Sequence, residues 1–245
     1  MKKIFILHSL TLFLSIHTYA QKDNPKATEV WEPVPKVITP GTTSQDPPTD
    51  AIILFNGKDL SNWTDGKLNF SKWRIENAVM TAEKGAGNIQ TRQAFGSCQL
   101  HVEWKTAPQI TDSGQNRGNS GIFFMGRYEV QVLDSYNNRT YSNGQAGSIY
   151  KQYIPLVNVC RPPGEWQSYD IIFTSPKFDT DSNIVSPARF IVFQNGVLIQ
   201  NNVEVKGETV YIGQPYYKKH NDKEYLVLQD HNCPVSYRNI WIREL

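Results

Sequence analysis

The sequence predicts an all-β fold in which two antiparallel sheets pack as a sandwich or jelly roll. Short segments of alternating apolar and polar residues recur through the chain, and turn-forming residues separate them. Beyond the N-terminal region, no stretch of ten or more residues has a helical hydrophobic period. The length of this part suits one sandwich better than two domains.

The first twenty residues have the pattern of a secretory signal peptide. Lys2 and Lys3 give a basic start, residues 4–16 form an apolar run, and Ala20 is a small residue at the boundary. The run is too short to span a membrane comfortably. No cysteine follows the boundary, so we expect a soluble exported protein, cleaved after Ala20, located in the periplasm and without a membrane anchor in its mature form.

Residues 21–49 are rich in proline, threonine and serine and have little apolar periodicity. We interpret them as a linker or an extended N-terminal arm that crosses the surface. Residues 50–245 are then expected to form a single β-sandwich domain that carries the active site.

The first expected strands are short and end at turn signals. Residues 52–56 are an apolar segment that runs into the turn dipeptide Asn56-Gly57. Residues 73–77 and 79–81 alternate on either side of a turn. Residues 99–105 alternate cleanly, with Leu100, Val102 and Trp104 on one face and His101, Glu103 and Lys105 on the other.

The remaining strands are predicted on the same grounds, from apolar segments bounded by turn residues. Residues 111–119 are rich in glycine, serine and asparagine and are expected to form a loop before a hairpin. Asn195-Gly196 is a strong hairpin signal between two apolar runs. Further strands are expected at residues 128–133, 147–150, 166–173, 188–193, 203–205, 225–230 and 237–243.

A polar comb on residues 128–134 is the first candidate site. Alternation directs Glu129 and Gln131 to a solvent-exposed face and the neighbouring valines to the core. Asp134 is out of phase, and a β-bulge near Leu133 would bring it to the polar face. The spacing is that of the E-x-D-x-x-E comb of jelly-roll glycosidases, with Gln131 replacing the middle acid, so it indicates a sugar-processing site.

Charge and cysteine content exclude other classes of function. The net charge is +2, from 25 basic and 23 acidic residues, and no block of like charge suggests a nucleic-acid groove. Cys98, Cys160 and Cys233 lack the paired spacing of a zinc site. Two states of these cysteines stay open: one disulfide with a free thiol, or three buried thiols.

Five motifs in order resemble the 3-keto-disaccharide hydrolase family, a group of exported bacterial proteins. They lie at residues 54–63, 118–123, 128–134, 228–231 and 237–245, so the likeness covers essentially residues 50–245. The resemblance implies a concanavalin A-like jelly roll and cleavage of 3-keto-glycosides or 3-keto-disaccharides. It also implies an upstream 3-dehydrogenase that supplies the oxidised saccharide.

The implied reaction uses the acidity that a C3 ketone gives to the hydrogen on C2. A base removes this proton, the C1 substituent leaves by β-elimination, and water adds to the enone-like product. Such chemistry needs a base at C2, an acid at the glycosidic oxygen and donors at the O3 enolate.

We assign candidate residues to these roles as hypotheses. Glu129 or His231 is the C2 base, and Asp134 or His231 protonates the leaving oxygen, since histidine titrates near neutrality. Lys105 or Arg117 stabilises the enolate. The candidate substrate-binding residues are Glu103, Arg117, Asn119, Gln131, Tyr150 and Gln229.

Three alternatives remain open. A divalent cation held by Glu103, Glu129 and His231 is one, because carboxylate and imidazole ligands suit transition metals. A carbohydrate-binding module without catalysis is the second, and it predicts exposed aromatic residues on a shallow face. An ordinary glycoside hydrolase is the third, and it predicts two carboxylates in one cleft.

Overall fold

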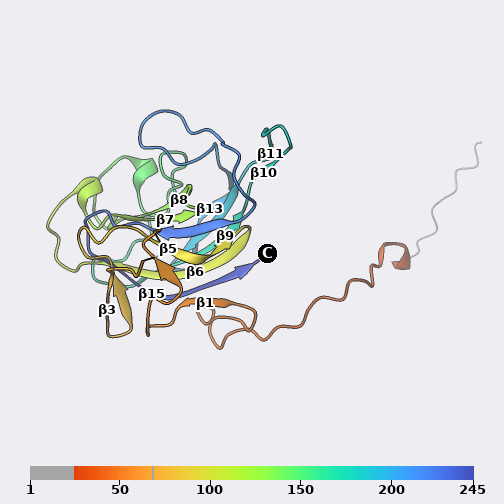
Figure 1. Ribbon diagram of the computed structural model, residues 1–245, viewed down its shortest axis with the longest axis horizontal. Coiled ribbons are helices and arrows are strands. Elements are labelled where there is room, and N and C mark those ends of the chain that lie inside the picture. Colours follow the sequence, from red (N-terminus) through yellow and green to blue (C-terminus); the bar gives the residue numbers. More distant parts are fainter. Residues whose placement is uncertain (1–24, 68) are drawn as a thin grey trace, which may run out of the picture. The chain divides into compact units, whose positions relative to one another are not determined.

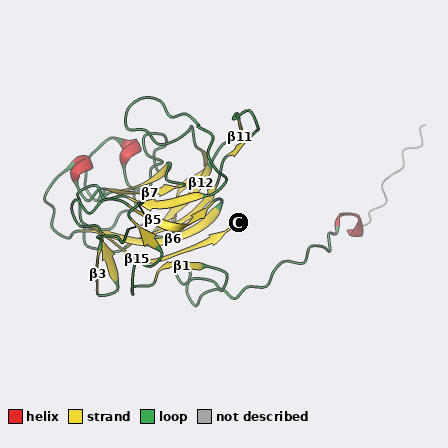
Figure 2. Ribbon diagram, viewed as in Figure 1, coloured by secondary structure: helices red, strands yellow, loops and turns green. Residues whose placement is uncertain are grey.

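The computed structural model describes residues 25–67 and 69–245 and confirms the predicted fold class, a concanavalin A-like jelly-roll sandwich of antiparallel sheets (Figures 1 and 2). The chain divides into two units, Met1–Val37 and Ile38–Leu245. Of the first unit only residues 25–37 are described, and they include the short 3-10 helix η1 (Pro25–Thr28). The expected signal peptide lies outside the described residues.

Nearly all regular structure in the second unit is strand, and its two helical turns lie in loops at one end of the sandwich (Figure 2). The helical turns are η2 (Gly114–Asn116) and η3 (Ser142–Gly144). The strands are β1 (Ile52–Phe55), β2 (Trp63–Thr64), β3 (Arg74–Glu76), β4 (Val79–Thr81), β5 (Ile89–Phe95), β6 (Cys98–Thr106), β7 (Ser120–Phe124), β8 (Tyr128–Val132), β9 (Gln167–Thr174), β10 (Lys177–Phe178), β11 (Ile184–Ser186), β12 (Arg189–Gln194), β13 (Val197–Glu204), β14 (Glu224–Leu228) and β15 (Val235–Glu244).

Two large sheets make up the sandwich. The eight-stranded sheet has the order β13-β12-β9-β6-β15-β4-β3, and β1 pairs with β15 beside this path. The five-stranded sheet has the order β2-β5-β14-β7-β8. Strands β10 and β11 form a separate ribbon. Neighbours such as β14 and β7 are far apart in sequence, so residues from distant motifs meet on the five-stranded sheet.

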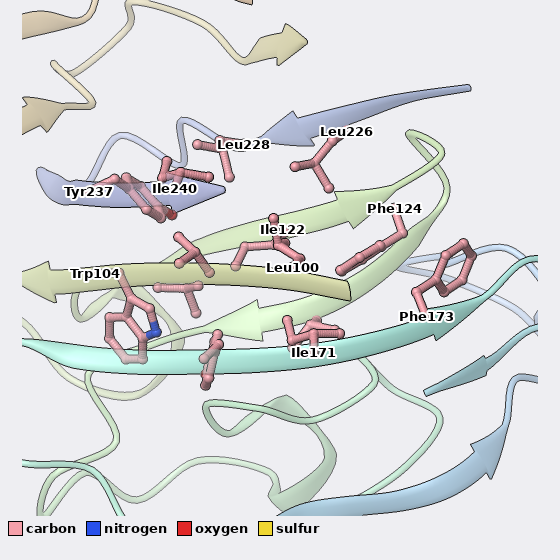
Figure 3. Packing of buried hydrophobic residues seen from close by; sticks show 14 of the residues in the cluster. Leu100, Trp104, Ile122, Phe124, Ile171, Phe173, Leu226, Leu228, Tyr237 and Ile240 are labelled. Atoms are coloured by element: carbon pink, nitrogen blue, oxygen red, sulfur yellow. The ribbon is translucent and has the colours of Figure 1, made fainter. Parts of the chain in front are cut away.

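The hydrophobic core fills the space between the sheets (Figure 3). Inward side chains of the eight-stranded sheet pack against those of β7 and β14, and all are nearly inaccessible to solvent. The residues labelled in the figure are Leu100, Trp104, Ile122, Phe124, Ile171, Phe173, Leu226, Leu228, Tyr237 and Ile240. The predicted inward face of residues 99–105 is therefore confirmed.

Two hairpin turns have positive φ at both of their central residues. Asn195 and Gly196 both have positive φ, 53° and 80°, and join β12 to β13 as a two-residue turn. Asn77 and Ala78, at 52° and 60°, join β3 to β4. Turns of this mirror-image type match the right-handed twist of the strands. They require positive φ at both central residues, which is why asparagine and glycine are common in them.

Two expectations about strands differ from the structure. Strand β5 has no counterpart among the predicted strands, because its polar residues 90–93 interrupt the apolar pattern. Residues 147–150 do not form a strand, and Ile149 makes only isolated bridges to Val130 and Tyr153. Gly147 has a φ of 75°, which is incompatible with a regular strand.

The part of the Pro-rich segment that belongs to the compact unit packs on β15. The backbone carbonyl of Gln45 accepts hydrogen bonds from Asn239 Nδ2 at 3.1 Å and Trp241 Nε1 at 2.9 Å. Asp50 forms an ion pair with Arg243 at 2.8 Å. Residues 38–49 thus cover part of the outer face of the eight-stranded sheet.

The three cysteines are free thiols in the structure, and Cys98 is buried. Burial raises the pKa of the Cys98 thiol to about 12. In the described part of the chain, no helix has the length and apolar character needed to span a membrane.

Candidate functional site

A pocket of about 280 Å³ lies over the outer face of the five-stranded sheet, on the side away from the core. We call it the glutamate pocket. Val130 and Val132 of β8 point into the core, so the intervening Glu129 and Gln131 point to this outer face. The pocket is lined by Asn119, Phe123, Glu129, Gln131, Tyr150, Thr209, Tyr211, Gln229 and His231.

The register of β7 and β8 explains why the Glu129 side chain lies close to the sheet. Gly121 pairs with Gln131, and Phe123 pairs with Glu129, so these residues share one face. A Cβ atom at Gly121 would collide with Oε1 of Glu129 and approach the Phe123 ring to 2.9 Å. The absence of a side chain at residue 121 therefore makes room for the carboxyl group.

Glu129 is almost completely shielded from water, with 4% of its surface exposed. Burial raises the pKa of its carboxyl group from 4.5 to about 8, because a charge is poorly solvated there. The backbone N–H of Glu129 donates to Thr209 Oγ1 at 3.0 Å, which ties β8 to the segment that carries Tyr211. A carboxyl group with a pKa this close to neutrality can take up and release a proton under ordinary conditions.

The Gln131 amide lies beside the Glu129 carboxyl group. With its nitrogen toward Glu129, it donates to Glu129 Oε1 at 3.1 Å and to Ser120 O at 3.0 Å. This orientation suits the Glu129 carboxylate, since a carboxylate only accepts hydrogen bonds.

The rest of the pocket comes from distant parts of the chain. Gln229 and His231 follow β14, which hydrogen-bonds to β7, and the N–H of Gln229 donates to Gly121 O at 3.0 Å. Tyr150 comes from the loop after β8, and its hydroxyl lies 2.6 Å from that of Tyr141. Burial, together with the Tyr141 hydrogen bond, raises the pKa of Tyr150, so this hydroxyl keeps its proton at neutral pH.

Six of the ten residues predicted for the site line this pocket. They are Asn119, Glu129, Gln131, Tyr150, Gln229 and His231. Glu129 and Gln131 were predicted to face solvent, but they are only 4% and 1% exposed, and residues from loops, such as Tyr150, line the pocket above them.

The structure places Arg117 and Asp134 outside the pocket, contrary to the prediction. Arg117 Nε lies 2.7 Å from Asp134 Oδ2, and both side chains are less than 10% exposed. Arg117 also donates to Tyr136 O at 2.8 Å. The predicted bulge near Leu133 is wrong, because β8 ends at Val132 and its pairing with β7 has no register shift. The phase of Asp134 changes because the strand has ended.

Glu103 and Lys105 lie on the outer face of the other sheet, so the core separates them from the glutamate pocket. Their strand, β6, pairs with β9 and β15 in the eight-stranded sheet. Glu103 accepts hydrogen bonds from Arg238 at 2.6 Å and Asn239 at 2.9 Å. The ammonium group of Lys105 lies 4.8 Å from the ring centroid of Trp166. Alternation correctly grouped these residues, but it did not show which sheet they belong to.

A buried histidine completes that outer network. His101 Nδ1 lies 2.7 Å from Asp170 Oδ1, and its Nε2 lies 3.9 Å from Glu103 Oε1. Burial alone would lower the pKa of His101, but the two carboxylates outweigh it and raise the pKa to about 9. For Glu103, burial alone would raise the pKa, but hydrogen bonds from His101, Asn239 and Arg238 lower it to about 2. The network is therefore charged at neutral pH.

The residues proposed to hold a divalent cation do not fit one ion. Glu129 and His231 share the pocket, but Glu103 lies on the far side of the sandwich. Within residues 25–67 and 69–245, no group of three or more histidine, cysteine, aspartate or glutamate side chains could hold a metal.

Three lining residues were not among the predicted site residues: Phe123, Thr209 and Tyr211. Phe123 could have been found, because its place in the hairpin puts it on the same face as Glu129. Thr209 and Tyr211 belong to an irregular segment after β13, and nothing in its sequence pattern indicates where it folds.

Comparison with known proteins gives a family and a close structural relative. Residues 50–243 match the family model described as 3-keto-alpha-glucoside-1,2-lyase-like domain. A crystal structure of a "putative glycosyl hydrolase" from Parabacteroides distasonis is 49% identical, with a TM-score of 0.86 over 91% of this chain and 97% of that one. A second such structure from the same organism is 21% identical, with a TM-score of 0.59 over 80% and 94% of the chains. No curated protein matches the sequence.

Proposed function

The chain belongs to the family of 3-keto-alpha-glucoside-1,2-lyase-like domains and is a carbohydrate-active, glycosyl hydrolase-like jelly roll, and from this premise we propose that it cleaves 3-keto-glycosides by elimination and hydration. The observation that carries the proposal is a single buried carboxyl group with a raised pKa, that of Glu129, in the lining of a sugar-sized pocket. The substrate would come from a dehydrogenase that oxidises C3 of a glycoside.

The number of carboxyl groups argues against an ordinary glycoside hydrolase. Retaining and inverting enzymes use two carboxyl groups on either side of the scissile bond. Among the described residues that line the glutamate pocket, Glu129 is the only carboxylic acid. Asp134, the other predicted acid, is held by Arg117 in a buried ion pair outside the pocket. One base is sufficient, however, where a ketone has already acidified the C2 hydrogen.

In the proposed reaction, the Glu129 carboxylate removes the proton from C2 of the bound 3-keto sugar. The electron pair of that C–H bond delocalises onto O3 as an enolate. Its return breaks the bond between C1 and the glycosidic oxygen, and the leaving oxygen takes up a proton. Water then adds its oxygen to C1 and gives its proton to the group that protonated the leaving oxygen, and the proton on Glu129 returns to C2, so that the balance is hydrolysis.

Two lining groups carry a proton that the leaving oxygen can accept. Tyr150 keeps its hydroxyl proton at neutral pH, as its raised pKa requires, and the Tyr141 hydroxyl is hydrogen-bonded to it. His231 lies on the exposed side of the pocket. The Gln229 amide is the group we assign to the enolate oxygen, in place of Lys105 and Arg117, which do not reach the pocket.

A binding module without catalysis fits the site less well. Such a module is expected to present aromatic side chains on a shallow face, where a sugar binds without losing much of its water. Here the lining includes a carboxyl group, that of Glu129, whose burial carries a free-energy cost. Strained or unfavourable groups of this kind are more common at catalytic sites.

The test is an assay of the purified protein on a 3-keto-glucoside beside the unoxidised glucoside. The proposal expects release of the leaving group from the 3-keto substrate alone. Cleavage of the unoxidised glucoside at a similar rate would support an ordinary hydrolase, and cleavage of neither substrate would support a binding module.

The pH dependence of that reaction provides a further prediction. The base must be ionised, and the pKa of Glu129 is raised to about 8. We therefore expect kcat/KM to rise about tenfold per pH unit below pH 8 and to level off above it. A profile that is already flat above pH 5.5 would show that Glu129 is not the base, or that its pKa is not raised.

A further inference from the structure

A second cavity, of about 450 Å³, adjoins the glutamate pocket. Tyr150 and Tyr211 line both spaces and form the boundary between them. With Tyr141 they give the second cavity three aromatic walls, so we call it the tyrosine chamber. Because the two spaces share Tyr150 and Tyr211 as walls, a substituent on a sugar bound over Glu129 can extend from the pocket into this chamber.

The chamber contains one positive charge and no negative one. Lys151 Nζ donates to Tyr211 O at 2.6 Å and lies 4.0 Å from the centroid of the Tyr211 ring. The described residues that line the chamber include no acid, and Lys151 has no carboxylate partner among the ion pairs of residues 25–67 and 69–245. An ammonium group has three donors, and one is used here.

The backbone holds Lys151 in place at some conformational cost. Its φ is 58°, in the left-handed region that is unfavourable for lysine, and its N–H donates to Asn143 O at 2.8 Å. The side chain is thus fixed at both ends, by Asn143 through the backbone and by Tyr211 through the ammonium group. This arrangement keeps a cation at the wall of the chamber.

The polar lining suits an aromatic ring better than a second sugar. A sugar carries several hydroxyl groups, each of which needs a partner when water is removed. Gln152 already bonds to Gly207 O at 3.0 Å and to the N–H of Lys206 at 2.7 Å. The amides of Asn143 and Gln214 are the uncommitted ones. Three tyrosine rings, in contrast, provide faces and edges for stacking.

We infer that the tyrosine chamber binds the leaving group of the substrate, that this group is an aromatic carboxylate, and that Lys151 recognises its charge. This inference rests on the proposed function, because it places the sugar over Glu129. It adds a preference for phenolic acid glycosides, whose phenolic oxygen is bonded to C1. The contact between Lys151 and the carboxylate is a charge-assisted hydrogen bond.

Binding of two unoxidised glucosides tests the inference without requiring turnover. The probes are 4-carboxyphenyl glucoside and 4-hydroxymethylphenyl glucoside, which have similar shapes and differ in charge. Titration calorimetry or ligand-observed NMR is expected to show the carboxylate binding about tenfold more tightly to the wild type, the size of a partly exposed charged hydrogen bond. Lys151→Gln should remove this preference and Lys151→Arg should keep it.

A matched control separates charge recognition from support of the loop. Lys206 lies 5.1 Å from the ring centroid of Tyr153, outside the chamber, so Lys206→Gln should leave the preference unchanged. Equal affinities for the two probes in the wild type, or an equal loss of both in Lys151→Gln, would overturn the inference, and so would failure of both probes to bind. Turnover of a neutral 3-keto-glucoside judges the proposed reaction separately, since that substrate carries no charge for Lys151.

Discussion

Replacing Glu129 with glutamine is expected to lower kcat/KM on a 3-keto-glucoside by at least about a hundredfold. Glutamine keeps the shape of the side chain and its place over Gly121, but it cannot accept the C2 proton. General acid and base groups contribute about two to four powers of ten. The measurement is the initial rate of leaving-group release at pH 8, where half of the wild-type carboxyl groups are ionised.

The same substitution is expected to stabilise the fold at alkaline pH. The pKa of Glu129 is about 8 in the folded protein, against 4.5 for an exposed glutamate. The stability that the protonated Glu129 side chain contributes to the folded protein is fully present below pH 4.5. It is lost as the pH rises through 8, because the buried carboxyl group must then ionise. The cost at high pH is on the order of a few kcal/mol. The Tm of Glu129→Gln should thus exceed that of the wild type at pH 9 and match it near pH 4.5.

Glu103→Gln is the matched control on the opposite sheet. In the wild type the pKa of Glu103 is lowered to about 2, so the ionised carboxylate stabilises the protein at every pH above 4.5. We expect this variant to have a lower Tm and wild-type kcat/KM, the reverse of Glu129→Gln. Wild-type rates in Glu129→Gln would remove Glu129 from the mechanism, and a large loss of rate in Glu103→Gln would contradict the separation of the two sites.

Local patterns were sufficient to predict the fold and to place Glu129 and Gln131 together on one face. The alternation of apolar and polar residues depends only on the geometry of a strand, so it correctly paired Glu129 with Gln131 and Leu100 with Val102. Turn residues gave the hairpin at Asn195, since its positive φ is a local property. Features of this kind need no knowledge of the rest of the chain.

The remaining errors concern information that is not local. Glu103 and Glu129 have the same pattern, and only the strand order shows that they lie on opposite sides of the core. A bulge and the end of a strand would both put Asp134 out of phase with Glu129 and Gln131, and the sequence pattern is the same in the two cases. Tyr211 reaches the pocket from a loop whose position depends on Lys151 and on other tertiary contacts.

Substitution of Arg117 by methionine is expected to reduce stability more than it reduces catalysis. Arg117 and Asp134 are buried together, and removal of one partner leaves the other charge without compensation. Breaking a buried ion pair costs about 3–5 kcal/mol. Arg117 also binds Tyr136 O, and the N–H of Tyr136 donates to Asp134 Oδ1 at 3.2 Å, so the loop after β8 should loosen. For a domain of this size the Tm should fall by roughly 10 °C.

Two further variants determine whether this effect comes from the buried pair. In Arg117→Met/Asp134→Leu both charges are absent, and we expect much of the lost stability to return, because no charge is left unpaired. Arg189 pairs with Glu204 at 2.5 Å on the surface, and Arg189→Met should cost at most about 1 kcal/mol. Thermal unfolding gives the Tm of all three variants, and their kcat/KM is measured at a temperature below the lowest of these Tm values. If Arg117→Met keeps its stability but loses turnover, the original assignment of Arg117 to the reaction is correct, because a residue needed only for the loop cannot give that result.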